Sequence, residues 1–449
     1  MANAGVSVPR SVEGASDEWV ALSGAVMRHG RDVADKLGAL MAKTPDAPAA
    51  LGAKGLAMLL LGRRENYEIA VACAAHARDV MDGATNHDRA YVNALSAFLD
   101  GQPSEAASMF DAALQRHPGD AFALKFAQAI RFLYGDSAGM RVSADAAAPL
   151  FSDDHPHAGY VYGCHAFACE ETGDLALAEK KGRHGLTLAK DDAWGLHAVA
   201  HVHEMRGHAK AGRDWLTGRE SVFAGCSNFA HHIWWHSALF ELDLGHIDAV
   251  LDLYDTRIRA EPTDDYRDVA NAVSILMRVE SEGVDVGTRW RELAEIAERR
   301  LEDGCIVFAD LHYLMALLAD DREEPANRLI ARLSAANDGS EFGAVAAGPG
   351  ASAADGLAAL RRGDPERAHD ALFNASRRLW QIGGSHAQRD VFVRATIDAA
   401  LSAGRGEEAR RLITERARRR GSFDGYAMAR LKRCGPPIVN APDATAAAF

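Results

Sequence analysis

The sequence predicts an all-α fold, an α-solenoid of tetratricopeptide-like helical hairpins that forms a curved superhelix. Three observations support this prediction. The alternating β-branched and aromatic residues typical of strands are almost absent, whereas alanine is abundant. Glycines recur at a nearly constant spacing, with small residues at fixed offsets from them. Finally, 449 residues is long for a domain with one closed core, but a repeat array grows by stacking.

The predicted helices begin after a polar leader over residues 1–18, with two amphipathic segments at Trp19–Lys43 and Pro48–Leu61. The repeat is clearest at Gly101 and Gly135, which are 34 residues apart, the tetratricopeptide period. Counted from Gly101, the small, aromatic, small and proline positions of the second helix are Ala106, Phe110, Ala113 and Pro118. Further turn glycines are expected at Gly173, Gly207, Gly245, Gly283, Gly363 and Gly404.

The repeats are expected to form a single domain over residues 19–434, with about nine or ten hairpins. Paired helices approach closely at the small residues, so each hairpin buries its apolar face by stacking on its neighbours. The Gly/Ala/Ser-rich stretch Ser334–Gly356 is interpreted as a long loop that covers or crosses the solenoid. The tail over residues 435–449 begins with Gly435 and two prolines and is expected to lack helical structure.

Composition excludes several classes of function. A formal net charge of −13 argues against a nucleic-acid partner, which requires a concentrated positive field. Six scattered cysteines without a CxxC pair indicate a reducing compartment. The first residues lack the pattern of a signal peptide, and no segment approaches the roughly 20 apolar residues of a membrane span. We therefore predict a cytoplasmic protein without a membrane partner, and no oligomeric state is predicted.

Histidines concentrate in one region: twelve of the 19 lie between His155 and His246. In the repeat register, several of these residues fall at positions of the first helix that face the concave surface. We interpret His201, Glu204 and His236 as candidate acid–base catalysts, because a carboxylate one turn away orients an imidazole and raises its pKa. The candidate residues for binding substrate beside them are Trp194, His197, His232 and Trp235.

Two alternatives stay open for this cluster. Histidines four residues apart on one helix can ligate zinc, so His197, His201, His232 and His236 are the ligands if a metal is bound. The segment His203–His208 does not match the HExxH metalloprotease pattern, because Gly207 replaces its second histidine. Alternatively, such residues are ordinary core residues whose ring nitrogens are satisfied by neighbours. No nucleotide-binding or dinucleotide fingerprint is present, so no cofactor is assigned.

Two sites outside the cluster complete the candidate pocket. In Gly383–Phe392, Ser385 suits a helix N-cap, and Arg389 with Asp390 in the first turns would hold an anionic group. The alternative is a structural Arg–Asp pair that fixes one hairpin to the next. His312, on another first helix, would form the far wall if the superhelix curls through about a full turn.

Three separated motifs resemble the family of tetratricopeptide repeat protein 38: WxxHAVAHxHEM (Trp194–Met205), HxxWHxAL (His232–Leu239) with YDTRI (Tyr254–Ile258), and GGSxAQRD (Gly383–Asp390). The resemblance runs from about Trp19 to Gly435 and implies the repeat architecture but no activity. Its pattern carries over onto Trp194, His197, His201, His203, Glu204, His232, Trp235, His236, Gly383, Gly384, Gln388, Arg389 and Asp390.

Two functions therefore compete. In the first, the concave His/Trp/Glu pocket binds a small polar or anionic molecule, with or without acid–base catalysis by the histidines and glutamate. In the second, the repeats form a non-catalytic scaffold that binds a peptide or protein in the groove. Peptide-binding arrays typically offer open ladders of Lys, Arg and Asn, whereas titratable and aromatic groups gather here, which favours the small ligand.

Overall fold

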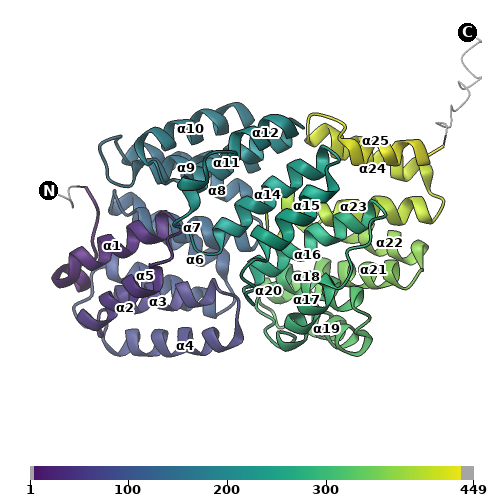
Figure 1. Ribbon diagram of the computed structural model, residues 1–449. Helices are drawn as coiled ribbons and strands as arrows, with labels where there is room; N and C mark the ends of the chain where they lie inside the picture. The colour runs from purple at the N-terminus through teal and green to yellow at the C-terminus, as the bar shows by residue number, and fades with distance from the viewer. Residues whose placement is uncertain (1–4, 436–449) are drawn as a thin grey trace, which may run out of the picture.

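The computed structural model describes residues 5–435 and is built from helices that pack in consecutive antiparallel pairs (Figure 1). Within these residues there is no strand, and the sole β-bridge joins Gly30 to Cys226. The all-α prediction is confirmed. No helix of the described residues is long and apolar enough to cross a membrane.

The first part of the chain forms hairpins in which each helix contacts its neighbours in sequence. Its elements are η1 (Arg10–Ala15), α1 (Ser16–Met27), α2 (Val33–Lys43), α3 (Pro48–Leu59), α4 (Arg64–Asp79), α5 (Asn86–Leu99), α6 (Pro103–Arg116), α7 (Ala121–Leu133), α8 (Ser137–Ala147), η2 (Ala148–Leu150), α9 (Ala158–Glu171) and α10 (Leu175–Leu188).

The middle of the chain continues the array and carries the histidine-rich helices. Its elements are α11 (Ala193–Met205), α12 (Ala209–Leu216), α13 (Glu220–Phe223), α14 (Phe229–Asp243), α15 (Ile247–Leu253), η3 (Tyr254–Ile258), α16 (Tyr266–Ser281), α17 (Arg289–Arg299), α18 (Val307–Ala319) and α19 (Glu323–Ala335).

The last part closes the array. Its elements are α20 (Glu341–Val345), η4 (Ala346–Gly350), α21 (Ala351–Arg361), α22 (Pro365–Ser376), η5 (Leu379–Ile382), α23 (His386–Ser402), α24 (Gly406–Arg419) and α25 (Gly425–Arg433). Of the predicted tail, only Gly435 lies within the described residues.

The repeat signals have the structural roles that the sequence assigns to them. Ala106, Phe110 and Ala113 are almost fully buried on α6, where they pack against α5 and α7. All eight predicted turn glycines have a positive φ, between 66° at Gly207 and 84° at Gly173, a region that side chains with a Cβ disfavour. These glycines end the first helix of each hairpin and allow the chain to reverse.

Three segments differ from the sequence-based interpretation. The single helix expected over Trp19–Lys43 is two helices, which residues 28–32 separate. Part of the expected leader is helical, and Val12 within it is fully buried. The long loop expected over Ser334–Gly356 is wrong, because most of this stretch is helical from Glu341 onward. Alanine favours helix strongly, and Ser340 caps α20 by accepting a hydrogen bond from the Gly343 amide.

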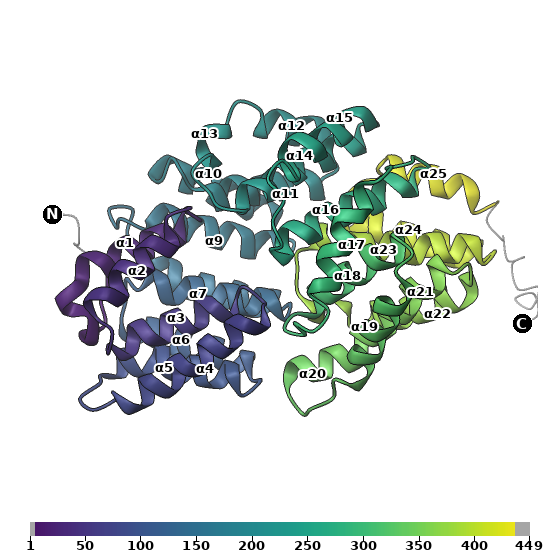
Figure 2. The same ribbon diagram turned by 60° about the horizontal axis from the view of Figure 1, so that its bottom comes forward.

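The superhelix curls far enough to bring the two halves of the chain side by side, and the chain passes from one half to the other through α11 to α16 (Figures 1 and 2). The contacts run between turns of the first half and segments of the second half. The Glu341 amide donates to the Gly101 carbonyl oxygen over 3.0 Å, and Phe342 packs on Phe98 with ring centroids 5.4 Å apart. The closed curve places the inner helices α9, α11, α14 and α16 next to the loops of the C-terminal hairpins.

Candidate functional site

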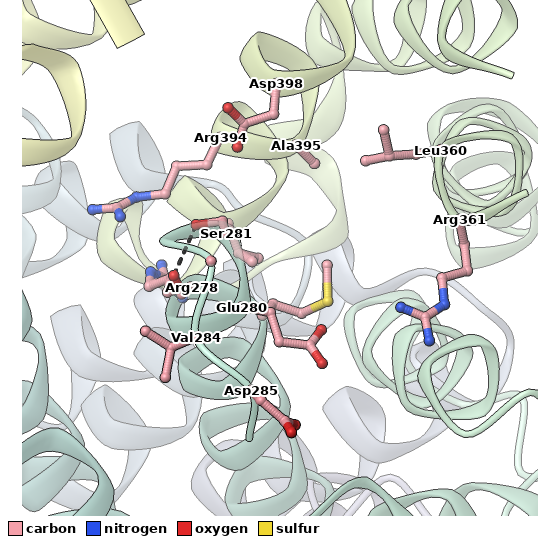
Figure 3. Close-up of a pocket in the computed structure, with 13 residues that line it drawn as sticks. Arg278, Glu280, Ser281, Val284, Asp285, Leu360, Arg361, Arg394, Ala395 and Asp398 are labelled. Atoms are coloured by element: carbon pink, nitrogen blue, oxygen red, sulfur yellow. Dashed lines mark hydrogen bonds between the residues drawn. The ribbon is translucent and has the colours of Figure 1, made fainter. Parts of the chain in front are cut away.

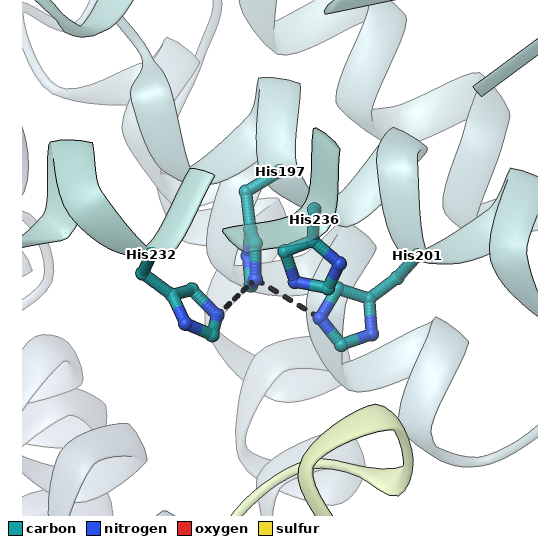
Figure 4. Close-up of side chains that lie close together, drawn as sticks. All are labelled: His197, His201, His232 and His236. Atoms are coloured by element: carbon teal, nitrogen blue, oxygen red, sulfur yellow. Dashed lines mark hydrogen bonds between the residues drawn. The ribbon is translucent and has the colours of Figure 1, made fainter. Parts of the chain in front are cut away.

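Four histidines come together where the first helices of two consecutive hairpins lie side by side. His197 and His201 lie one turn apart on α11, and His232 and His236 lie one turn apart on α14. A spacing of four residues places both rings of each helix on one face, and the two helices are in contact. Figure 4 shows the four rings turned toward a common space between the helices.

The ring nitrogens of this four-histidine cluster approach one another closely. Nε2 of His197 lies 2.9 Å from Nε2 of His201 and 3.0 Å from Nε2 of His232. The ring centroid of His236 is 4.5 Å from that of His201, and its own Nε2 is buried without a hydrogen-bond partner among the described residues. One nitrogen from each of the four rings lies within 4.8 Å of the others. The cluster therefore offers four nitrogen donors to one point.

The opposite nitrogen, Nδ1, faces an oxygen atom in three of the four rings. The pairs are Nδ1 of His201 with Oε2 of Glu170 at 3.3 Å, Nδ1 of His236 with Oε2 of Glu204 at 3.2 Å, and Nδ1 of His232 with Oδ1 of Asn271 at 3.0 Å. A carboxylate or amide oxygen accepts a hydrogen bond from Nδ1–H, so the contacts of His236 and His232 favour the tautomer with a free lone pair on Nε2.

Burial and charge set the protonation of the cluster. Burial lowers the pKa of His197 and His232 well below the usual value and that of His236 to about 4. Burial also lowers the pKa of His201, but the nearby Glu170 carboxylate outweighs it and leaves this pKa raised. Burial raises the pKa of Glu170 as well. At neutral pH these three rings are therefore neutral, whereas the Glu170 carboxylate favours the charged form of the His201 ring.

Two carboxylates connect the cluster to the C-terminal hairpins. Oε1 of Glu171 accepts a hydrogen bond from the His386 amide over 2.9 Å, and the Arg389 guanidinium lies 3.5 Å from Oε2 of Glu171. Glu204, which orients His236, also accepts from Arg420 over 3.2 Å. Burial raises the pKa of Glu204, but its hydrogen bond with His236 and the charge of Arg420 hold the net pKa well below the usual value. The site is complete only when the superhelix is closed.

The two predicted tryptophans flank the cluster. Trp235 is fully buried, donates its Nε1 hydrogen to Oγ of Ser274 over 3.1 Å, and stacks on His232 with centroids 5.2 Å apart. Trp194 is partly buried and packs on His197 with centroids 5.1 Å apart. Both indoles form walls around the imidazoles, so the structure brings them together with the predicted histidines and Glu204.

His312 lies apart from the four histidines. Its Nδ1 donates to the Phe308 carbonyl oxygen over 2.7 Å, and its ring packs against those of Phe308 and Phe392. Its Nε2 has no partner among the described residues, and burial lowers its pKa to about 4. The structure gives His312 an aromatic core environment, in place of the far wall expected from repeat register.

Arg389 and Asp390 diverge in direction although they are adjacent. Arg389 turns toward Glu171 and donates to the Gly384 carbonyl oxygen, and no hydrogen bond joins it to the four histidines. Asp390 turns the other way and is held by Arg416 at 2.6 and 2.9 Å and by Arg394 at 2.8 Å. This is the geometry of the alternative interpretation, in which Asp390 fixes one hairpin to the next.

Sequence reasoning did not assign a role to four residues of the cluster's surroundings. Glu170 falls on a groove-facing position of its repeat. The contacts of Glu171 with His386 and Arg389, and that of Glu204 with Arg420, form only when the superhelix closes. Asn271 lies on α16, whose hairpin carries no histidine signal. Only Glu170 had a detectable signal, the repeat position. Glu171 follows Glu170 on α9 and Asn271 lies on the hairpin after α14, whereas Arg420 comes from a segment distant in sequence.

The structure also contains a cavity of about 560 Å³ between α16, α21 and α23 (Figure 3). None of the candidate residues named above lines it. Its charged lining is mixed, with Arg278 and Arg394 at one end and Glu280 and Asp398 also contributing. This cavity is therefore distinct from the histidine cluster and shows no preference for an anion.

Asp192, the residue before α11, makes the free energy of unfolding depend on pH. Asp192 is fully buried, and burial raises its pKa to about 7, against the attraction of Lys125. A carboxyl with a higher pKa in the folded state binds more protons when folded, so stability falls as pH rises from the unfolded pKa near 4 toward 7. Between pH 5 and pH 8 we expect a loss of about 2–3 kcal/mol that Asp192→Asn abolishes. Urea unfolding of both proteins across this range measures the difference, and parallel pH profiles would contradict it.

Comparison with known proteins leaves the family open. No protein-family model matches the sequence. Among solved structures, the human IFIT1 dimer with PPP-AAAA is 12% identical, with a TM-score of 0.43 over 93% of this chain and 94% of that chain. The structure of Naa15/Naa10 bound to HypK-THB is 14% identical, with a TM-score of 0.25 over 88% of this chain and 68% of that chain. The function must therefore be argued from the residues of this chain.

Proposed function

We propose that this tetratricopeptide-like repeat protein is a ligand-binding protein whose site is the four-histidine cluster, with acid–base capacity in His201, His236 and Glu204. The observation that carries the proposal is the set of buried ring nitrogens that converge on one another and leave Nε2 of His236 and Nδ1 of His197 without a partner among the described residues. A buried polar atom without a partner costs about 1–3 kcal/mol, so a bound ligand is the simplest reason to keep several together.

A second buried histidine shows what a structural role looks like in this fold. Nε2 of His87 lies 2.7 Å from Oδ2 of Asp120, whose carboxylate also accepts from Tyr91 over 2.8 Å. The ring stacks on His117 with centroids 4.0 Å apart. His87 is satisfied by its protein neighbours, whereas the four-histidine cluster turns its nitrogens toward other nitrogens.

The cluster also has the parts for proton transfer. Glu204 orients His236 from one side, and Glu170 pairs with His201 from another. A carboxylate behind an imidazole fixes its tautomer and stabilises the charged ring, which is the arrangement of a general acid or base. The motifs that resemble the tetratricopeptide repeat protein 38 family include His201, Glu204 and His236 of this set, and we propose on that resemblance that the chain belongs to that family.

The proposal makes a prediction for stability without ligand. Replacing His197 by leucine removes a ring that makes no carboxylate contact, so His197→Leu should leave the unfolding free energy of ligand-free protein unchanged or raise it. The matched control His87→Leu should lower it by about 2 kcal/mol, because Asp120 and Tyr91 lose a buried partner. Urea unfolding of chelator-treated, dialysed protein measures both values. An equal loss in the two variants would assign the cluster a structural role and favour the peptide-binding scaffold.

A further inference from the structure

We propose that the ligand of the four-histidine cluster is a divalent transition-metal ion, bound by the Nε2 atoms of His197, His201, His232 and His236. This inference rests on the proposed function, because it identifies the ligand of the same site. Three independent features support it: the convergence of the donors, the impossibility of satisfying them with protons, and the carboxylates behind the rings.

The donor geometry is close to that of a bound ion. Imidazole nitrogens lie about 2.0–2.1 Å from zinc, which places the corners of a tetrahedron about 3.3 Å apart. Nε2 of His197 lies 2.9 and 3.0 Å from Nε2 of its two neighbours in the cluster, His201 and His232. Binding would thus require these two contacts to widen by about 0.3–0.4 Å and any wider pair, all of which lie within 4.8 Å, to close.

Protons alone cannot satisfy the cluster well. A neutral imidazole nitrogen carries either one hydrogen or one lone pair, so Nε2 of His197 forms a good hydrogen bond with one neighbour and not with two. The Nδ1 contacts to Glu204 and Asn271 leave His236 and His232 with lone pairs on Nε2. Several lone pairs then face the same space. A cation that accepts all of them removes this conflict.

The surroundings have the charge and polarity of a metal site. Ligating histidines usually donate their second N–H to a carboxylate or an amide oxygen, which fixes the ring and raises its basicity. Glu170, Glu204 and Asn271 occupy these positions. The Glu170 carboxylate would offset part of the charge of a divalent ion, and Glu204, which also pairs with Arg420, would add to this.

The donor set also indicates the class of metal. Imidazole suits zinc, copper, iron and nickel, whereas magnesium and calcium require oxygen ligands. His197, His201 and His236 are almost fully buried, and His232 is partly exposed at the edge of the site. A closed set of four side chains from rigid helices is typical of a tightly held ion.

Calorimetric titration of ZnCl₂ into chelator-stripped full-length protein without a polyhistidine tag tests the inference. We expect one zinc ion per chain, and at least about 100-fold weaker binding in the double variant His197→Leu/His236→Leu. The control is His184→Ala, because the half-buried His184 pairs with the exposed Asp153 and is not one of the four cluster residues. Its binding should match that of the wild type.

Two further readouts locate the ion. Cobalt in place of zinc should give the visible absorption of a tetrahedral site, which the double variant lacks. Glu170→Gln should weaken zinc binding about 10–100-fold by loosening His201. Its control is Glu179→Gln, since Glu179 pairs with Arg183 and Arg206 near the surface. Equal zinc binding by wild type and double variant would overturn the metal inference, as would an octahedral cobalt spectrum.

The stability test and the zinc titration can contradict the proposed function and the metal inference independently. If zinc does not bind but His197→Leu leaves stability unchanged or raised, the metal inference is wrong and the cluster remains a site for another ligand. If zinc does not bind and His197→Leu destabilises the chain as His87→Leu does, both the metal inference and the proposed function are wrong.

Discussion

Gly135→Ala is expected to lower the free energy of unfolding by at least about 3 kcal/mol. Gly135 has a φ of 76°, where a Cβ costs about 1–2 kcal/mol. In addition, a Cβ at this position would overlap the carbonyl oxygen of Trp380, a backbone atom that cannot rotate away. The turn of one hairpin is thereby pressed against η5 in the distant half of the chain. Urea unfolding followed by circular dichroism measures the loss.

The control isolates the contribution of superhelix closure. Gly245 is a turn glycine with a φ of 81°, but a Cβ there would meet nothing within 4 Å. Gly245→Ala should therefore lose only the conformational cost of about 1–2 kcal/mol. Equal losses in the two variants would show that the halves of the superhelix do not pack as closely as the structure has them.

Asp390→Ala is expected to cost about 3–5 kcal/mol, because breaking a buried ion pair leaves charges without their partner. The side chains of Arg394 and Arg416 are 6% and 3% exposed, and both bond to Asp390. Arg416 would keep Asp424, which lies in the turn before α25, and Arg394 would keep only contacts of 3.7 Å to Asp243 and 3.9 Å to Asp424. Chemical unfolding of the full chain measures the effect.

A surface pair provides the reference for Asp390. Asp355 and Arg367 form a bidentate ion pair on an exposed face, with side chains 39% and 64% exposed. Asp355→Ala should cost no more than about 1 kcal/mol, because solvent screens such pairs. A loss at Asp390 as small as this, together with lost affinity for phosphate or acetate, would restore the anion-binding interpretation.

Local sequence signals predicted much of the fold. A positive φ at a turn selects glycine, and close helix pairing selects small residues, so Gly101, Ala106 and Ala113 mark one hairpin without any tertiary information. The prediction of a loop over Ser334–Gly356, which was based on glycine and serine content, was wrong. The segment that begins at Glu341 is helical, and Phe342 packs on Phe98 more than 240 positions away in the sequence.

The candidate site was predictable to the extent that it depends on one helix at a time. Spacing of four residues and repeat register place His197 with His201 and His232 with His236, and the register then aligns α11 with α14. The partners of these rings depend on how the superhelix closes. Arg420 contacts Glu204 although it lies 216 positions further along the chain, and no local sequence pattern predicts this contact.

The proposed metal centre combines four imidazoles from two adjacent hairpins. The C-terminal hairpins contribute Arg420, which pairs with Glu204 behind His236, and Arg389, which pairs with Glu171 near His201. The closed superhelix thus holds the rings in place, whereas an isolated hairpin would leave them free to separate.

The most direct test is the metal content of the chain purified without a polyhistidine tag, by elemental analysis alongside His201→Ala and His236→Ala. We predict close to one transition-metal ion per wild-type chain and its loss in both variants. A wild-type chain that is isolated without metal, and that takes up no more zinc than the two variants after incubation with one equivalent, would contradict the account.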